Sequence, residues 1–261
     1  MLSLLSGLEV RVLCVILLLN TDLEAVVGIY IVTACLCEYN ADVILLQVTH
    51  IDGTDVILGL SNRNRLYVDG QEVANNVTSL VVHSEFILLT TLRHMLLCAQ
   101  LNRKGLQSLT KGQCGPGRRI ERGARLVTSV AGGTCVVLQM PRGNLECIQP
   151  RPLTLHVATV LLDAGHYGAA FQLLRKQRIN LNLLCDHQPM EFITNIDSVI
   201  DDLQEPTWLS LFLSELQEDS VTHSMYKEYY AHLDQLPDML TNKVCVSFVI
   251  FISFECSMIC L

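Results

Sequence analysis

Only a few positions place reactive side chains close together in the sequence. Asp186 and His187 are adjacent, but neighbouring residues of a helix point in different directions, and no nucleophile motif accompanies this pair. We therefore expect both to have a structural role at a helix end. Asp201, Asp202 and Glu205 carry the oxygen atoms that a hard cation prefers, yet the spaced ligands and central glycine of a cation-binding loop are missing. We expect a solvated acidic face there.

The cysteines do not form a recognisable metal or disulfide framework. The chain has 11 of them, an odd count, scattered along 261 residues. Cys35 and Cys37 are close in sequence, as are Cys256 and Cys260, but neither pair is a CxxC motif or has a histidine nearby. This pattern predicts reduced thiols in the cytosol and no zinc site.

Signatures of the common enzyme classes are also missing from the sequence. It contains no GxSxG elbow, no HExxH helix and no GxxxxGK[ST] phosphate loop. We therefore predict that the chain is not an enzyme, and that it binds no cofactor, metal ion or small-molecule substrate.

Charge is divided unequally along the chain. Residues 1–150 carry 12 Lys and Arg against 12 Asp and Glu, whereas residues 151–261 carry 6 against 14, so the second part holds the whole net charge of −8. Such an acidic protein repels nucleic acid unless a local basic surface outweighs its net field. One group of arginines is a candidate for that surface: Arg118, Arg119, Arg122 and Arg125. Because Glu121 interrupts this group and no aromatic residue accompanies it, we expect a solvated loop.

Both ends of the chain are apolar. Residues 1–20 lack the basic start of a signal peptide, and Glu9 and Arg11 interrupt the run, which favours core strands. Residues 244–261 contain one charge, Glu255, and as a helix would span about 27 Å, slightly less than a hydrocarbon core of about 30 Å. A membrane segment there is marginal, and a tail-anchored membrane protein remains an alternative hypothesis.

From residue 41 to residue 148, short apolar runs alternate with turn residues every eight to twelve positions, a rhythm typical of antiparallel sheet. Asp69-Gly70 predicts a tight hairpin turn, and residues 141–144 predict another. Propeller blades, a sandwich and a barrel share this pattern, so it indicates only an all-β fold. The runs that we predict to be strands are 43–48, 56–60, 65–68, 79–82, 86–91, 95–100, 126–130 and 135–139.

Near Pro150 and Pro152 the period of the apolar residues changes to three and four, which indicates helices. Small residues beside a large one predict helical hairpins that pack closely, as in a solenoid. The predicted helices are 153–163, 167–178, 189–203, 206–217 and 220–233.

Several segments of this chain resemble the largest, scaffold subunit of the Elongator complex. They are 138–146 (LQMPRGNLE), 175–183 (RKQRINLNL) and 211–216 (LFLSEL), followed by similarities at 186–189, 196–199 and 219–222. The resemblance covers roughly residues 20 to 226 and is best from residue 136 onward.

This resemblance implies a truncated or fragmentary form of that subunit. It implies the C-terminal blades of a WD40-like β-propeller (residues 1–150), the first helices of a TPR-like α-solenoid (151–243) and an unmatched apolar tail (244–261). It also implies a non-catalytic scaffold, cytoplasmic or also nuclear, that supports modification of the wobble uridine U34 of tRNA. The implied partners are the catalytic acetyltransferase and radical subunit and a second propeller subunit, with tRNA contacted indirectly.

Arg175, Lys176 and Arg178 are the residues that we single out as a partner or RNA contact. They end the second predicted helix, where cations also stabilise the negative end of the helix dipole, so a purely structural role is the competing interpretation. The coarse architecture equally permits a scaffold of a vesicle coat or another trafficking complex.

Overall fold

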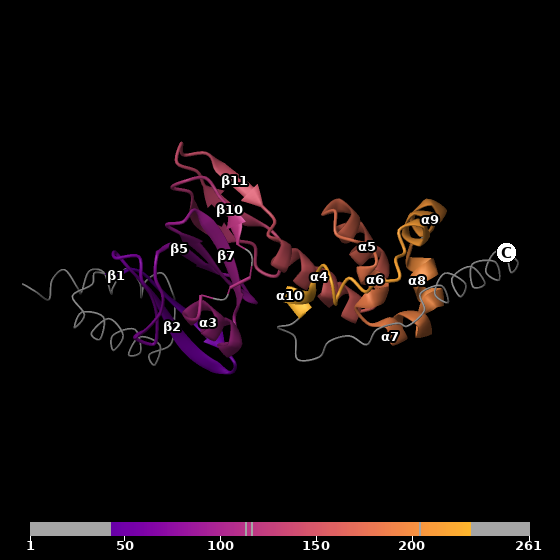
Figure 1. The fold of residues 1–261 in the computed structure, drawn as a ribbon, viewed down its shortest axis with the longest axis horizontal. Helices are drawn as coiled ribbons and strands as arrows, with labels where there is room; N and C mark the ends of the chain where they lie inside the picture. Colours follow the sequence, from indigo (N-terminus) through magenta and orange to yellow (C-terminus); the bar gives the residue numbers. More distant parts are fainter. Residues whose placement is uncertain (1–42, 113, 116, 204, 231–261) are drawn as a thin grey trace, which may run out of the picture. The chain divides into compact units, whose positions relative to one another are not determined.

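The computed structural model describes residues 43–112, 114–115, 117–203 and 205–230. The chain divides into two compact units, residues 1–150 and residues 151–261 (Figure 1). The core strands expected within residues 1–20 and the apolar tail at 244–261 lie outside the described residues. Among the described residues, no helix is both long and apolar enough to cross a membrane.

The first sheet is a four-stranded antiparallel meander. Strands β1 (Val43–Ile51), β2 (Thr54–Ser61), β3 (Leu66–Val68) and β4 (Gln71–Ala74) follow one another in space as they do in sequence. The hairpin predicted at Asp69-Gly70 is confirmed, because both residues have a positive φ, 47° and 83°, and join β3 to β4.

The second sheet repeats this topology with one insertion. It consists of β5 (Val77–Val82), β6 (Phe86–Thr91), β7 (Met95–Gln100) and the short β8 (Arg118–Arg119). The prediction that the arginines near residue 120 form only a loop is therefore wrong for Arg118 and Arg119, which pair with Leu96 and Met95. A two-residue strand is too short to show an apolar period in the sequence, so only its pairing with β7 identifies it as a strand.

Helix α3 (Arg103–Thr110), which the sequence pattern did not predict, connects β7 to β8. The side chain of Asn102 caps it by accepting a hydrogen bond of 2.7 Å from the Gly105 N–H. The helix is short and most of its residues are polar, so this cap and the buried Leu109 are its main signals.

The third sheet has three described strands, in the order β11-β10-β9. Strand β9 spans Arg125–Ser129, β10 spans Val136–Gln139 and β11 spans Leu145–Ile148. The hairpin predicted at residues 141–144 is confirmed by the β10–β11 pairing. A disulfide joins Cys135 to Cys147 across this hairpin, so the expectation of reduced thiols is wrong for these two residues, while Cys98, Cys114 and Cys185 keep their thiols.

One inner strand of each of the first two sheets, β2 and β6, is buried on both faces. Every residue from Val56 to Ser61 in β2 and from Phe86 to Thr90 in β6 is buried. A sheet with one face in water would alternate buried and exposed residues, so each of these sheets is covered on both sides. Leu58, Leu66 and Ile87, each at 0% exposure, belong to this shared core.

The second unit contains seven described helices. They are α4 (Arg151–Asp163), α5 (Tyr167–Lys176), α6 (Leu183–Asp186), α7 (Pro189–Thr194), α8 (Ile196–Leu203), α9 (Pro206–Ser214) and α10 (Lys227–Tyr230).

Two helix predictions need correction. The single helix expected over residues 189–203 is broken at Asn195 (φ −102°, ψ 23°), because asparagine favours helix ends over helix interiors. The helix expected over 220–233 begins only at Lys227 within the described residues. Before it, the hydroxyl groups of Ser220 and Thr222 bond to each other at 2.7 Å, a local hydrogen bond that competes with helix formation.

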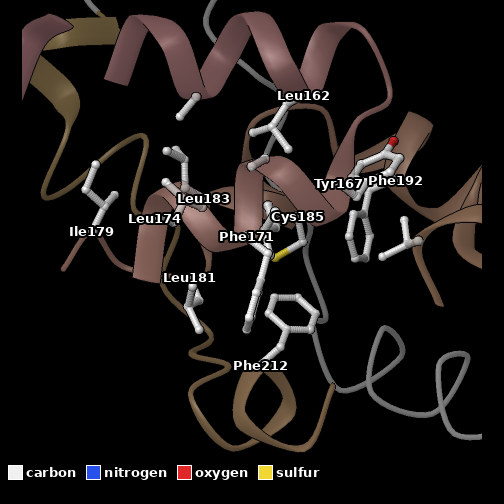
Figure 2. Close-up of a cluster of buried hydrophobic side chains, with 14 of the residues drawn as sticks. Leu162, Tyr167, Phe171, Leu174, Ile179, Leu181, Leu183, Cys185, Phe192 and Phe212 are labelled. Atoms are coloured by element: carbon white, nitrogen blue, oxygen red, sulfur yellow. The ribbon is translucent and has the colours of Figure 1, made fainter. Parts of the chain in front are cut away.

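Helix α5 lies at the centre of the second hydrophobic core (Figure 2). Its residues Phe171 and Leu174 are at 0% exposure, and the Phe171 ring stacks on Trp208 of α9 with centroids 5.3 Å apart. Phe192 connects the other side of this core, meeting the rings of Tyr167 and Phe212, each at 5.9 Å. The helices are therefore tied together mainly by aromatic and leucine side chains, each worth about 1.5–3 kcal/mol when fully buried.

Helices α5 and α8 approach so closely that only glycine fits at residue 168. A Cβ atom added to Gly168 would lie 2.5 Å from the backbone oxygen of Asp202. We expect Gly168→Ala to destabilise the helical unit by about 1–3 kcal/mol, because the overlapping atom is backbone and must move. Urea unfolding followed by circular dichroism measures this loss.

The matched control is Ala169→Gly, at the exposed neighbouring position in α5. It reports helix propensity alone, which favours alanine by about 1 kcal/mol. If propensity dominated at residue 168, Gly168→Ala would instead raise stability, and the close approach would have no energetic importance.

Candidate interaction surface

The predicted contact residues lie at the C-terminal end of α5. Arg175 and Lys176 form its last turn, and both side chains are exposed. Their charges face the helix end where the unpaired carbonyl groups concentrate negative potential. This position explains why cations are favourable there, and it leaves both head groups accessible to a ligand.

Arg178 closes the same helix in a left-handed conformation. Its φ is 52°, the Arg178 N–H donates to the Arg175 oxygen at 3.2 Å, and the Ile179 N–H donates to the Leu174 oxygen at 2.9 Å. These two bonds form a Schellman motif, in which glycine is the usual residue at the left-handed position. Ile179 and Leu174 are both buried in the same core, which completes the motif with its usual apolar contact.

A fourth cation, Arg151, joins this site, and the sequence analysis missed it. Its Nη1 atom donates a hydrogen bond of 3.1 Å to the carbonyl oxygen of Gln177, 26 residues later. A cation in the first turn of α4 is not favoured by that helix's own dipole, but the negative end of α5 is near and offers an acceptor. No local sequence signal pairs these positions, because only the packing of α4 on α5 brings them together.

We call Arg151, Arg175, Lys176 and Arg178 the basic cluster. It gathers four of the six Lys and Arg residues that the sequence has from residue 151 onward. None of the four takes part in an ion pair with another described residue. Guanidinium and ammonium groups in this arrangement suit carboxylate or phosphate groups of a partner, so the cluster can bind an anionic surface.

A substitution at Arg178 separates the structural role of this residue from its charge. We expect Arg178→Gly to stabilise the helical unit by about 1 kcal/mol, because glycine adopts a positive φ without strain. Arg178→Val should destabilise it, since a β-branched residue fits that conformation poorly. Thermal unfolding of both variants tests the motif, and equal stability of the two would contradict it.

Asp186 and His187 contact different partners. The Asp186 carboxylate accepts a hydrogen bond of 2.8 Å from the Val221 N–H. His187 instead bridges Tyr230, at 2.8 Å from Nδ1, and Asp163, at 2.8 Å from Nε2. Both residues are buried, so the structural role predicted for them describes these contacts.

Burial favours the protonated form of the Tyr230 hydroxyl in this bridge. It raises the pKa of Tyr230 above its ordinary value, with nearby Tyr229 and Asp163 adding to the effect. The phenol therefore keeps its proton, and the His187 ring lies within hydrogen-bond distance of both this hydroxyl and the Asp163 carboxylate. Three segments distant in sequence are joined in this way.

Removing the Tyr230 hydroxyl should weaken the helical unit. We expect Tyr230→Phe to lower the free energy of unfolding by about 1–3 kcal/mol, because the buried Nδ1 of His187 loses its partner. Tyr229→Phe is the matched control, since the Tyr229 hydroxyl lies at 3.3 Å from Thr159, a weaker contact. Equal effects in urea unfolding would show that the bridge contributes little.

The remaining candidates have ordinary contacts. Asp202 accepts a hydrogen bond from the Gly168 N–H at 3.4 Å, near the N-terminus of α5, and the described residues contain no group of three or more metal-binding side chains. Burial raises the pKa of the free Cys98 thiol to about 12, with Cys114 adding to the shift, which leaves this thiol unreactive at neutral pH. Arg119, Arg122 and Arg125 are exposed on the first unit.

Two family models match the chain, and they match its two units in order. The model described as "ELP1 N-terminal second beta-propeller" covers residues 29–127, and the model described as "ELP1 alpha-solenoid" covers residues 151–250. The meandering sheets and the helical hairpins therefore define a propeller-and-solenoid protein. The predicted fold class, propeller blades followed by solenoid helices, is confirmed.

Curated relatives give the same assignment. The chain is 42% identical over 183 residues to "Putative elongator complex protein 1" of Xenopus laevis, which covers 67% of this chain and 16% of that protein. It is 40% identical to "Elongator complex protein 1" of Rattus norvegicus, over 69% of this chain and 14% of the relative, and 38% identical to that of Saccharomyces cerevisiae, over 66% and 13%. The chain belongs to the Elongator complex protein 1 family and spans about one sixth or less of these relatives.

Proposed function

We propose that this chain is a non-catalytic scaffold segment of the Elongator complex. The observation that carries the proposal is the order of its two matched regions, a second-propeller region followed by a solenoid region that begins at residue 151, where the second compact unit also begins. Both kinds of repeat present broad surfaces to partners.

The finer function follows from the family. As a scaffold segment, the chain holds the catalytic acetyltransferase and radical subunit and a second propeller subunit, and so supports modification of the wobble uridine U34 of tRNA in the cytoplasm or also the nucleus. The basic cluster of Arg151, Arg175, Lys176 and Arg178 is the contact that we assign to an acidic partner surface or to RNA, because it is exposed and lacks ion pairs within the described residues.

Affinity purification of the full chain from cells, followed by mass spectrometry, tests this proposal. We expect the other Elongator subunits to accompany the chain. Recovery of vesicle-coat proteins instead would favour the alternative scaffold, and recovery of chaperones alone would show that this segment does not suffice for assembly.

A charge-reversed variant tests the role of the basic cluster in the same experiment. We expect Arg175→Glu with Lys176→Glu to lower recovery of Elongator subunits about tenfold, as when two or more favourable charge contacts are replaced by repulsion. Lys104→Glu with Lys227→Glu is the matched control, because it changes the net charge equally and places Glu in the first turn of α3 and α10, where it is tolerated. Unchanged recovery of RNA and subunits with the cluster variant would show that the cluster does not bind them, and that its charges only stabilise the end of α5.

A further inference from the structure

Most arginines of the first unit lie near the turns at one end of its strands. We call this end of the strands one edge of the unit, and a series of backbone contacts defines it. The Val77 N–H donates to Asn64 of the β2–β3 turn at 2.9 Å, and the Leu92 N–H of the β6–β7 turn donates to Asn76 at 2.8 Å. The Ile120 N–H donates to His94 at 2.9 Å, which joins the β6–β7 turn to the segment after β8. These bonds place four connections of the first two sheets side by side: β2–β3, β4–β5, β6–β7 and the segment after β8.

The same edge continues into the third sheet. A Cβ atom added to Gly123 would lie 3.4 Å from Cγ of Pro141, so the β8–β9 connection packs against the β10–β11 turn. Arg125 pairs with Gln139, one residue before the start of that turn. The connections of all three sheets therefore form one continuous surface.

Six arginines lie on or next to these connections, and we call them the arginine rim: Arg63, Arg93, Arg119, Arg122, Arg125 and Arg142. All six are exposed, and none forms an ion pair with another described residue. Glu121 is the acidic residue among them, and the neighbouring Arg65 is already paired with Glu72 at 2.9 Å. The rim therefore has a concentrated positive charge in a chain whose net charge is −8.

The charged residues in the turns at the opposite edge of the same sheets are acidic. Asp52 lies in the β1–β2 turn, Asp69 in the β3–β4 turn and Glu85 in the β5–β6 turn. Asp52 accepts a hydrogen bond of 3.1 Å from the Arg103 N–H, which places the start of α3, with Arg103 and Lys104, on this edge as well, and the Arg103 side chain lies 4.0 Å from the Asp52 carboxylate. Topology separates the two groups of turns, because alternate turns of a meander open on opposite edges, and the residues in those turns decide their charge.

A cavity adjoins the middle of the rim. It has a volume of about 610 Å³, and Asn75, Asn76 and Arg93 contribute both to its wall and to the connections of the rim. Its buried lining residues Val77, Leu89 and Leu109 are apolar. Glu72, which is paired with Arg65, and Lys111 also line the cavity. A volume of this size accepts a large apolar side chain.

We propose that the arginine rim binds an acidic segment of another protein, with one apolar side chain of that segment in the cavity beside Arg93. Arginine around an apolar anchor site is a combination typical of protein interfaces. RNA is the less favoured ligand, because the aromatic side chains Tyr67 and Phe86 of the described part of the first unit are buried and cannot stack on bases, and the net negative charge opposes a long polyanion. The residues of this surface belong to the first unit, whereas those of the basic cluster belong to the second.

Fluorescence anisotropy with the full chain tests the proposal. The probe is a labelled peptide of alternating glutamate and glycine with one central leucine. We expect binding that weakens as salt is added, an affinity loss of about tenfold in Arg93→Glu with Arg122→Glu, and no loss in the control Lys104→Glu with Lys227→Glu. Replacing the leucine of the peptide by alanine should lower affinity several-fold, because the buried apolar area is lost.

Circular dichroism establishes that each variant is folded, and Arg93→Gln with Arg122→Gln replaces the reversed variant if it is not. Absence of peptide binding, or equal binding by the rim variant and the control, would overturn the proposal. Tighter binding of an RNA hairpin, with the same dependence on Arg93 and Arg122, would also overturn it and assign the rim to phosphate groups.

Discussion

The close approach of α5 to α8 is the constraint on which the helical unit depends. Gly168 permits it, because a single added carbon would overlap the Asp202 backbone. With α5 held there, Phe171 stacks on Trp208 of α9 and Leu174 is buried in the core. The C-terminal end of α5 carries the Schellman motif at Arg178, and the Gln177 oxygen there accepts the Arg151 hydrogen bond. The basic cluster is therefore a consequence of the same packing.

Buried polar side chains hold together the parts of this unit that are not regular helix. Asn182, at 1% exposure, donates to the Glu215 oxygen at 2.7 Å and accepts from the Gln217 N–H at 2.8 Å, which ties the end of α9 to the start of α6. Asp186 holds Val221 in the same manner. These bonds satisfy backbone groups that have no partner within a helix. Asp186, which resembles part of a reactive site in the sequence, therefore has a structural role in the fold.

The first unit combines a shared apolar core with edges of opposite charge. Strands β2 and β6 are buried on both faces, whereas the turns and connections at the two edges hold exposed charged residues that can contact other molecules. Positive charge on one edge and negative charge on the other orient an approaching partner more than they bind it tightly. Two exposed basic surfaces on two separate units are consistent with a scaffold that contacts more than one partner.

The sequence by itself determined most strands, the first two helices of the second unit, the family and the position of Arg175, Lys176 and Arg178. Turn residues such as Asp69-Gly70 and apolar periods are local signals, and the segment 138–146 is distinctive. Only the tertiary structure decided that Arg118 and Arg119 form a strand, that Asn195 breaks a helix, that Cys135 bonds to Cys147 and that Arg151 meets α5. Each of these depends on a partner distant in sequence or on weak local preferences that packing overrides, because local periodicity does not record which segments become neighbours.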